Sequence, residues 1–201
     1  VPYLKSEKIP ANQRDLYKSF ERGSKKETLY MHCLRAFENA LKYGENELLM
    51  IGEGDWNDAL NNIGNDKKGE SVWLSMFCYY TINQFSDYFK NEDKEFYSEN
   101  LLKLKKGIDK AYNGNWYNRA FTKDGEWLGN EDCDSCKIDL ISQAFAAICD
   151  GCEKEKAAKS LVFAMTLADK ENKLVKLLAP PFNDKKYYGY ISNYPEGVRE
   201  N

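Results

Sequence analysis

Apolar residues recur at helical spacing in several stretches of the chain, and polar turns separate these stretches. The pattern predicts a helix over residues 24–43, which opens at the capping box Ser24-Lys-Lys-Glu27 and ends before Gly44. A strongly apolar stretch over residues 70–90 predicts a second helix that is buried on more than one side. The same spacing predicts further helical segments at 91–113, 136–150, 153–169 and 174–178.

A strand is marked by alternating apolar and polar residues, and no stretch of the sequence shows this alternation over more than a few residues. The only strand expected is a short hairpin around Asp124-Gly125, which lies between aromatic stretches. Residues 1–23 are predicted to form an extended polar lead-in and residues 61–69 a polar loop. We therefore predict an all-α fold of antiparallel helical hairpins, whose connecting loops carry the polar and aromatic side chains.

Composition narrows the class of protein. The 201 residues suffice for one domain or for a piece of a larger one. The net charge of −3 gives no reason to expect a nucleic-acid partner, and no apolar run reaches the roughly 18 residues of a membrane span. The chain begins at Val1 without a signal-peptide pattern, and we expect a cytoplasmic piece of a longer protein.

Six cysteines raise the question of a metal site. Cys133-Asp-Ser-Cys136 and Cys149-Asp-Gly-Cys152 are two C-x-x-C pairs, as in a zinc ribbon. The residues between them have helical spacing, and a helix of that length spans roughly 20 Å, whereas thiolates on one zinc lie within about 4 Å of each other. We expect free thiols in a reducing compartment and no metal.

The stretch Gly52-Glu-Gly-Asp-Trp-Asn-Asp-Ala-Leu-Asn61 carries the strongest chemical signal. Two carboxylates (Asp55 and Asp58), an indole (Trp56) and an amide (Asn57) fall within four residues, after glycines that free the backbone. An indole face stacks on a sugar ring, and carboxylates accept hydrogen bonds from sugar hydroxyls. The alternative is a helix start that Asp55 or Asn57 caps, and the residues alone leave both interpretations open.

Five stretches in order give the chain a resemblance to glycoside hydrolase family 94. The family includes inverting phosphorylases of disaccharides and oligoglucans, such as cellobiose and 1,2-β-oligoglucan phosphorylase, and the related domain of cyclic β-1,2-glucan synthases. The stretches are Gly54-Asp-Trp-Asn-Asp58, Gly69-Glu-Ser-Val-Trp-Leu74, Trp116-Tyr-Asn-Arg-Ala-Phe121, Cys136-Lys-Ile-Asp139 with Ser142-Gln-Ala144, and Ala179-Pro-Pro-Phe182 with the tail to Asn201.

The resemblance implies a partial (α/α)6-barrel catalytic domain over residues 1–201, incomplete at both ends. It implies that Asp58 is the general acid, which protonates the glycosidic oxygen while phosphate attacks the anomeric carbon from the opposite face. Phosphate is already an anion, so the second carboxylate that an inverting hydrolase needs as a base is not required. Asp58 must be protonated at the working pH, and we expect burial, phosphate or the neighbouring Asp55 to favour that state.

The resemblance also implies sugar contacts. Trp56 matches a position that holds the sugar, Asp55 and Asn57 flank it, and Arg119 and Lys137 are plausible loop contacts. No cofactor is expected; a β-linked oligosaccharide and inorganic phosphate are the expected ligands, and the residues that bind phosphate are expected to lie outside this chain. We expect self-association as a homo-oligomer, because a partial barrel exposes an apolar flank.

Three hypotheses remain open from the sequence. The first is that the whole protein is a phosphorylase of β-linked gluco-oligosaccharides. The second is that this region belongs to a chain-processing domain of a cyclic β-1,2-glucan synthase. The third is that the piece is a non-catalytic sugar-binding unit. On the first hypothesis the 201-residue piece itself is expected to be inactive, because further sugar and phosphate contacts are expected outside it.

Overall fold

The computed structural model describes all residues except 14–15 and 65–67. The chain divides into two compact units, residues 1–40 and 41–201. The prediction that one domain covers the whole chain therefore stays a prediction.

The first unit contains a short β-hairpin followed by a helix. Strand β1 (Pro2–Leu4) runs antiparallel to β2 (Arg22–Lys26), and helix α1 (Leu29–Ala40) follows. The predicted extended lead-in at 1–23 thus contains paired strand at both ends, while residues 14–15 within it lie outside the described residues.

The start of the first helix differs from the prediction. Ser24 lies in β2, so the proposed capping box does not form. The hydroxyl of Thr28 instead accepts a hydrogen bond from the backbone N–H of Met31, at 3.2 Å. Thr28 has the same capping chemistry as serine, and the spacing of the apolar residues could not tell the two positions apart.

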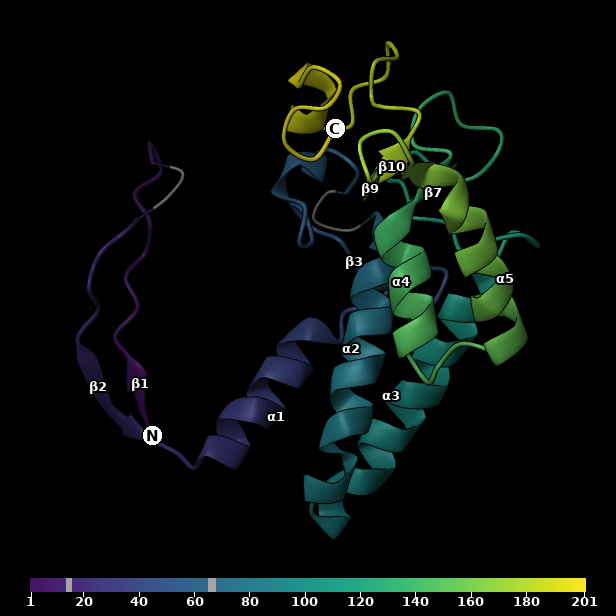
Figure 1. Cartoon of the computed structure of the whole chain (residues 1–201). Coiled ribbons are helices and arrows are strands. Elements are labelled where there is room, and N and C mark those ends of the chain that lie inside the picture. The colour runs from purple at the N-terminus through teal and green to yellow at the C-terminus, as the bar shows by residue number, and fades with distance from the viewer. Residues whose placement is uncertain (14–15, 65–67) are drawn as a thin grey trace. The chain divides into compact units, whose positions relative to one another are not determined.

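The second unit is built on two helical hairpins. Helix α2 (Val72–Phe85) packs against α3 (Asn91–Lys110), α4 (Leu140–Ile148) packs against α5 (Lys154–Ala164), and α2 also packs against α4 (Figure 1). The four longer helices predicted in this unit all form, and each ends before its predicted last residue. Among the described residues, no helix has the length and apolar character needed to cross a membrane.

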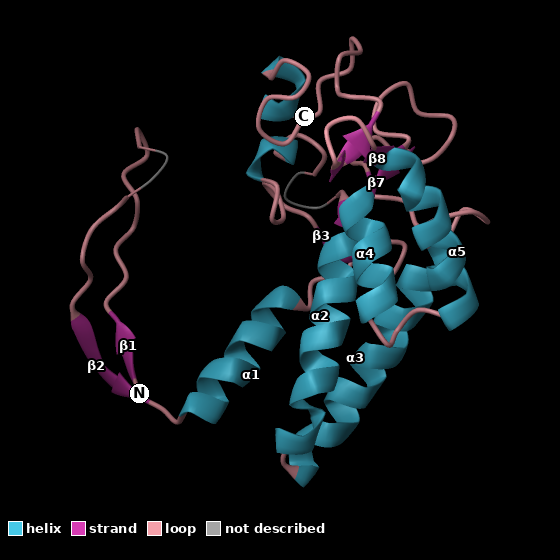
Figure 2. Cartoon of the chain, in the orientation of Figure 1, coloured by secondary structure: helices cyan, strands magenta, loops and turns pink. Residues whose placement is uncertain are grey.

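Short strands and the loops between them lie at one end of these helices (Figure 2). Four of them form an antiparallel sheet in the order β3 (Leu49–Met50), β4 (Glu70–Ser71), β5 (Ala120–Phe121) and β6 (Trp127–Leu128). Two further antiparallel pairs are β7 (Ile138–Asp139) with β10 (Leu178–Ala179), and β8 (Ala168–Asp169) with β9 (Leu174–Val175). Short 3₁₀ helices are η1 (Asp58–Leu60), η2 (Ser86–Tyr88), η3 (Met165–Leu167) and η4 (Tyr190–Asn193).

The described residues therefore form a mixed α/β structure, and the predicted all-α class is wrong. The partial (α/α)6 barrel stays a prediction. Every strand of the second unit has two residues, which is too short to leave an alternating pattern in the sequence. The predicted helical turn at 174–178 is also wrong, since those residues lie in and between β9 and β10. The hairpin predicted around Asp124-Gly125 is confirmed as β5 and β6.

Buried residues of the second unit fall into separate clusters. One cluster lies beneath the strands and loops and includes Ile51, Leu60 and Ile191. Another lies between the helices and includes Met76 and Ile108. The first cluster includes Ala59 and Leu60 of η1, so the stretch Gly52–Asn61 is anchored in the core.

Candidate functional site

The stretch singled out in the sequence forms a tight turn that leads into η1. Gly54 has a φ of 134°, a backbone conformation that L side chains rarely adopt. The side chain of Asn57, which is 3% exposed, caps η1 by accepting a hydrogen bond from Ala59 N–H at 3.0 Å. The capped-start interpretation thus holds for Asn57, whose amide oxygen is used within the chain.

Asp55 points inward from this turn and binds Arg119 in a bidentate ion pair. Each carboxylate oxygen of Asp55 accepts from one terminal nitrogen of the Arg119 guanidinium, both at 2.7 Å. Asp55 also accepts from the Ser71 hydroxyl at 2.6 Å and from the Asn57 backbone N–H at 3.1 Å. Both side chains of the ion pair are completely buried.

Arg119 connects this turn to the start of two core helices. Its Nε lies 3.3 Å from a carboxylate oxygen of Asp139. The other oxygen of Asp139 caps α4 by accepting from Ile141 N–H, and Ser71 caps α2 by accepting from Leu74 N–H. The buried triad of Asp55, Arg119 and Asp139 therefore fixes the turn relative to both helix N-termini.

Burial and charge act in opposite directions on the two carboxyls of the triad. Burial alone would raise the pKa of Asp55, but the Arg119 guanidinium and the hydrogen bonds of Asp55 hold that pKa below its ordinary value. Burial raises the pKa of Asp139, and Arg119 offsets this only in part. Burial would lower the pKa of Arg119, but the charges of Asp55 and Asp139 raise it, so the guanidinium stays charged.

Trp56 and Asp58 point the other way. Trp56 is 37% exposed and Asp58 is exposed, so the indole and this carboxyl are both open to solvent at the start of η1. The burial that we expected around the Asp58 carboxyl is therefore not found within the described residues. The negative charge expected from Asp55 is also offset, because Arg119 pairs with it.

The remaining two predicted site residues lie in different surroundings. Arg119 is part of the buried triad, so its guanidinium contacts Asp55 and Asp139 rather than an open surface. Lys137 is exposed at the start of the β7 segment, and its backbone carbonyl accepts from the indole N–H of Trp116 at 3.1 Å. The structure thus brings Asp55, Asn57 and Arg119 into contact and leaves the Lys137 side chain apart from them.

The aromatic loop around Trp116 is packed into the protein. The Trp116 indole also donates to the Gly129 carbonyl at 2.7 Å. The side chain of Gln143 on α4 accepts from Tyr117 N–H and donates to the Tyr117 carbonyl, at 2.9 and 2.8 Å. This segment therefore supports the site through its backbone instead of presenting its aromatic rings to a ligand.

Three buried polar residues near the site were not given these roles from the sequence. Asp139 directly precedes an apolar helix, which is a capping signal that could have been used. Ser71 precedes α2 in the same way. Glu70 is buried and accepts from the backbone N–H groups of Asn46 and Leu48, and no pattern in the sequence indicates this role.

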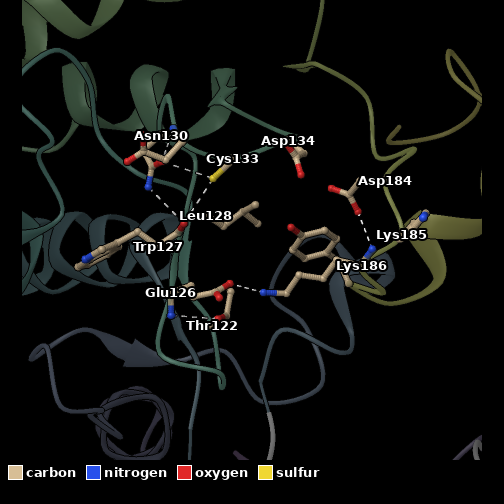
Figure 3. Close-up of a pocket in the computed structure, with 12 residues that line it drawn as sticks. Thr122, Glu126, Trp127, Leu128, Asn130, Cys133, Asp134, Asp184, Lys185 and Lys186 are labelled. Atoms are coloured by element: carbon tan, nitrogen blue, oxygen red, sulfur yellow. Dashed lines mark hydrogen bonds and ion pairs between the residues drawn. The ribbon is translucent and has the colours of Figure 1, made fainter.

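Figure 3 shows a cleft of about 590 Å³ whose lining residues lie outside the turn itself. One wall comes from residues 122–134 and the other from residues 184–188. Both walls are bonded to the loop that follows η1, because Asn62 donates from its backbone N–H to the Tyr188 carbonyl and accepts from Lys123 Nζ. Its size lies in the range of small-molecule sites.

The cysteines are free thiols. The two C-x-x-C pairs lie before and after α4, and burial raises the pKa of Cys136 well above its ordinary value. No cluster of three or more potential metal ligands occurs among the described residues.

These features define a class: a domain whose helices carry, at the end where the short strands lie, a rigid turn with an exposed indole and carboxyl. The chain belongs to the glycosyl hydrolase 94 superfamily, and residues 11–201 match the catalytic domain of that family.

Known relatives agree with this assignment. The chain is 32% identical to the cyclic β-(1,2)-glucan synthase NdvB of Rhizobium meliloti, in an alignment that covers 100% of this chain and 7% of that protein. It is 31% identical to the solabiose phosphorylase of Paenibacillus borealis, over 87% of this chain and 24% of the relative. It is 25% identical to the N,N'-diacetylchitobiose phosphorylase of Vibrio furnissii, over 87% of this chain and 22% of the relative. The chain therefore spans less than a quarter of the length of these relatives.

Proposed function

We propose that the protein is a glycoside phosphorylase that cleaves β-linked gluco-oligosaccharides with inorganic phosphate, inverts the anomeric centre and releases a sugar 1-phosphate. The observation that carries this proposal is the rigid turn of a family 94 catalytic domain, with Asp58 and Trp56 presented on its open side. The relatives named above include two phosphorylases and a β-(1,2)-glucan synthase, and on this basis we take a β-1,2-linked glucan as the first substrate to test.

In this proposal the turn divides the work between its two carboxylates. Asp58 donates a proton to the glycosidic oxygen as the bond to the departing sugar breaks, and a phosphate oxygen forms the new bond at the anomeric carbon. Trp56 stacks on the sugar ring. Asp55 keeps the turn in place through Arg119 and does not itself need to contact the sugar.

Asp58→Asn in the full-length protein tests this mechanism, with release of sugar 1-phosphate as the assay. A general acid contributes about 10²- to 10⁴-fold to the rate, so we expect at least a hundredfold loss of kcat. The matched control is Glu53→Gln, which neutralises an exposed carboxylate in the same turn and is expected to leave the rate unchanged. An unchanged rate in Asp58→Asn would remove Asp58 from the mechanism.

A second measurement separates acid catalysis from misfolding. A substrate with an activated phenol as leaving group needs little protonation, so Asp58→Asn should cleave it at a rate much closer to that of the unchanged protein. Equal losses on both substrates would contradict a proton-donating role.

The second candidate is a chain-processing domain of a cyclic β-1,2-glucan synthase. The observation that favours it is the alignment with NdvB over the whole of this chain. Product analysis distinguishes the two: a phosphorylase consumes phosphate and yields a sugar 1-phosphate, whereas chain processing without phosphate consumption would support the synthase. A cytoplasmic location and a homo-oligomeric state remain parts of the proposal to be tested.

A further inference from the structure

The cleft between residues 122–134 and 184–188 contains a hydroxyl group that no described residue bonds. Tyr188 lines the cleft and is only 8% exposed. Its hydroxyl makes no hydrogen bond to any described residue, although its backbone N–H donates to Ser192 at 2.9 Å. The hydroxyl is not one of the fully buried polar atoms without a partner, so it is open to solvent and can bond a ligand that enters the cleft.

Tyr188 belongs to the core cluster under η1 and also lines the cleft. Burial raises the pKa of Tyr188, and the nearby Asp184, Cys133, Glu126 and Cys136 raise it further. The first three of these side chains also line the cleft. The Tyr188 hydroxyl therefore remains protonated at neutral pH and can both donate to and accept from a hydroxyl group of a ligand.

The remaining lining is polar and acidic. Figure 3 shows Glu126 and Asp134 on one wall and Asp184, Lys185 and Lys186 on the other. With Asp132, four carboxylates stand against two ammonium groups, and Lys186 is already paired with Glu126. An uncharged sugar can donate its hydroxyls to these carboxylates, whereas a ligand with its own carboxylate is repelled.

We propose that this cleft binds an uncharged sugar unit of the oligosaccharide and discriminates against sugars that carry a carboxylate, with Tyr188 and Asp134 as specificity-determining residues. This inference rests on the proposed function, because it takes the ligand to be part of the same β-linked glucan. It adds a second contact region to the one formed by Trp56 and Asp58.

The test is calorimetric binding to the full-length protein in phosphate-free buffer, so that no turnover occurs. The probes are sophorose, a neutral β-1,2-linked glucose disaccharide, and the same disaccharide with one C6 oxidised to a carboxylate. Tyr188→Phe removes one hydroxyl and should weaken sophorose binding between about twofold and tenfold. The matched control Tyr187→Phe alters an exposed neighbour that does not line the cleft and should change nothing.

Asp134→Asn tests the charge argument. Removal of one negative charge roughly 5 Å from the ligand carboxylate in water should tighten binding of the oxidised disaccharide about fourfold. This gain should shrink as salt is added, and sophorose should not show it. Asp87→Asn, an exposed carboxylate away from the cleft lining, is the control and should affect neither sugar.

The outcomes separate this inference from the proposed function. If Tyr188→Phe and Asp134→Asn bind both sugars as the unchanged protein does, while phosphate-dependent cleavage is intact, the cleft proposal is overturned alone. If the expected binding changes occur but no sugar 1-phosphate is formed, the cleft proposal is supported and the phosphorylase proposal fails.

Discussion

Arg119→Met tests the view that one buried guanidinium holds the signature turn in place. The substitution preserves much of the side-chain volume but removes every charge-assisted contact of Arg119. The Asp55 and Asp139 carboxylates, whose side chains are 0% and 4% exposed, then remain buried without a cation. Breaking a buried ion pair in this way costs about 3–5 kcal/mol of unfolding free energy.

For a chain of this length, each kcal/mol corresponds to a shift in Tm of about 2–4 °C, so the expected loss is about 6–20 °C at pH 7. The assay is thermal unfolding of the 201-residue chain, followed by far-UV circular dichroism. Arg199→Met is the control, because Arg199 is an exposed arginine of the same unit, and we expect little change in its Tm.

The pH dependence provides a sharper test. In the unchanged protein the pKa of Asp55 is lowered, so this group stabilises the fold above its unfolded pKa of about 3.9 and loses that effect as the pH falls through its folded pKa. Without Arg119, burial is left to raise the pKa of Asp55 and to raise that of Asp139 further. A group with a raised carboxyl pKa destabilises the fold increasingly as the pH rises above the unfolded value.

The deficit of Arg119→Met should therefore be larger at pH 7 than at pH 5, where the buried carboxyls can take up protons. A Tm loss below about 2 °C at pH 7, or one of equal size at both pH values, would refute the assignment of the triad as the anchor of the turn.

Three further predictions concern the surroundings of the site and the first unit. In thermal unfolding, Gly129→Ala should destabilise the chain more than Gly125→Ala. Both glycines have positive φ, and an alanine in that conformation costs about 1–2 kcal/mol. A Cβ at position 129 would also lie 2.4 Å from Arg119 N, whereas one at position 125 meets nothing within 4 Å. In a pH titration by NMR, Glu27 should have a pKa of about 2 because Arg35 binds it. The contribution of this pair to stability is therefore complete above about pH 4.5 and is lost as the pH falls through about 2. A midpoint at the ordinary pKa of a glutamate would contradict the pairing. A zinc chelator should leave the Tm unchanged, because the two cysteine pairs lie at opposite ends of α4, and a fall in Tm would indicate a metal site.

The sequence predicted the long helices of the second unit because their apolar spacing persists over several turns, as in α3. It did not predict the two-residue strands that pair with segments far along the chain, such as β4 with β5. Such contacts have no periodic pattern in a single sequence. The all-α class failed for this reason, and the hairpin at β5 and β6 succeeded because a local turn specifies it.

The candidate site shows the same division between local and distant information. The capping role of Asn57 follows from its neighbours, and it was one of the alternatives considered. The ion pair of Asp55 with Arg119 joins residues 64 positions apart, so the sequence did not reveal it. Both residues were expected to contact sugar, whereas the structure places their side chains in the interior. The contribution of Tyr188 to the cleft depends on a similar long-range contact with Asn62.

Asp55 and Asp58 are the same residue type, three positions apart in one turn, yet they face opposite environments. The difference arises because the turn has a fixed partner on one side only: Arg119 and Ser71 take up both oxygens of Asp55, and Asn57 uses its side chain to start η1. The remaining carboxyl is thus left facing solvent beside an exposed indole. A buried, charged aspartate that fixes the backbone and an exposed one that is free to meet a ligand are complementary requirements of a site that must place a proton accurately. For this reason Asp55→Asn should lower both stability and catalysis, whereas Asp58→Asn should lower catalysis alone, and comparison of the two variants by Tm and by kcat would separate the positioning residue from the reacting one.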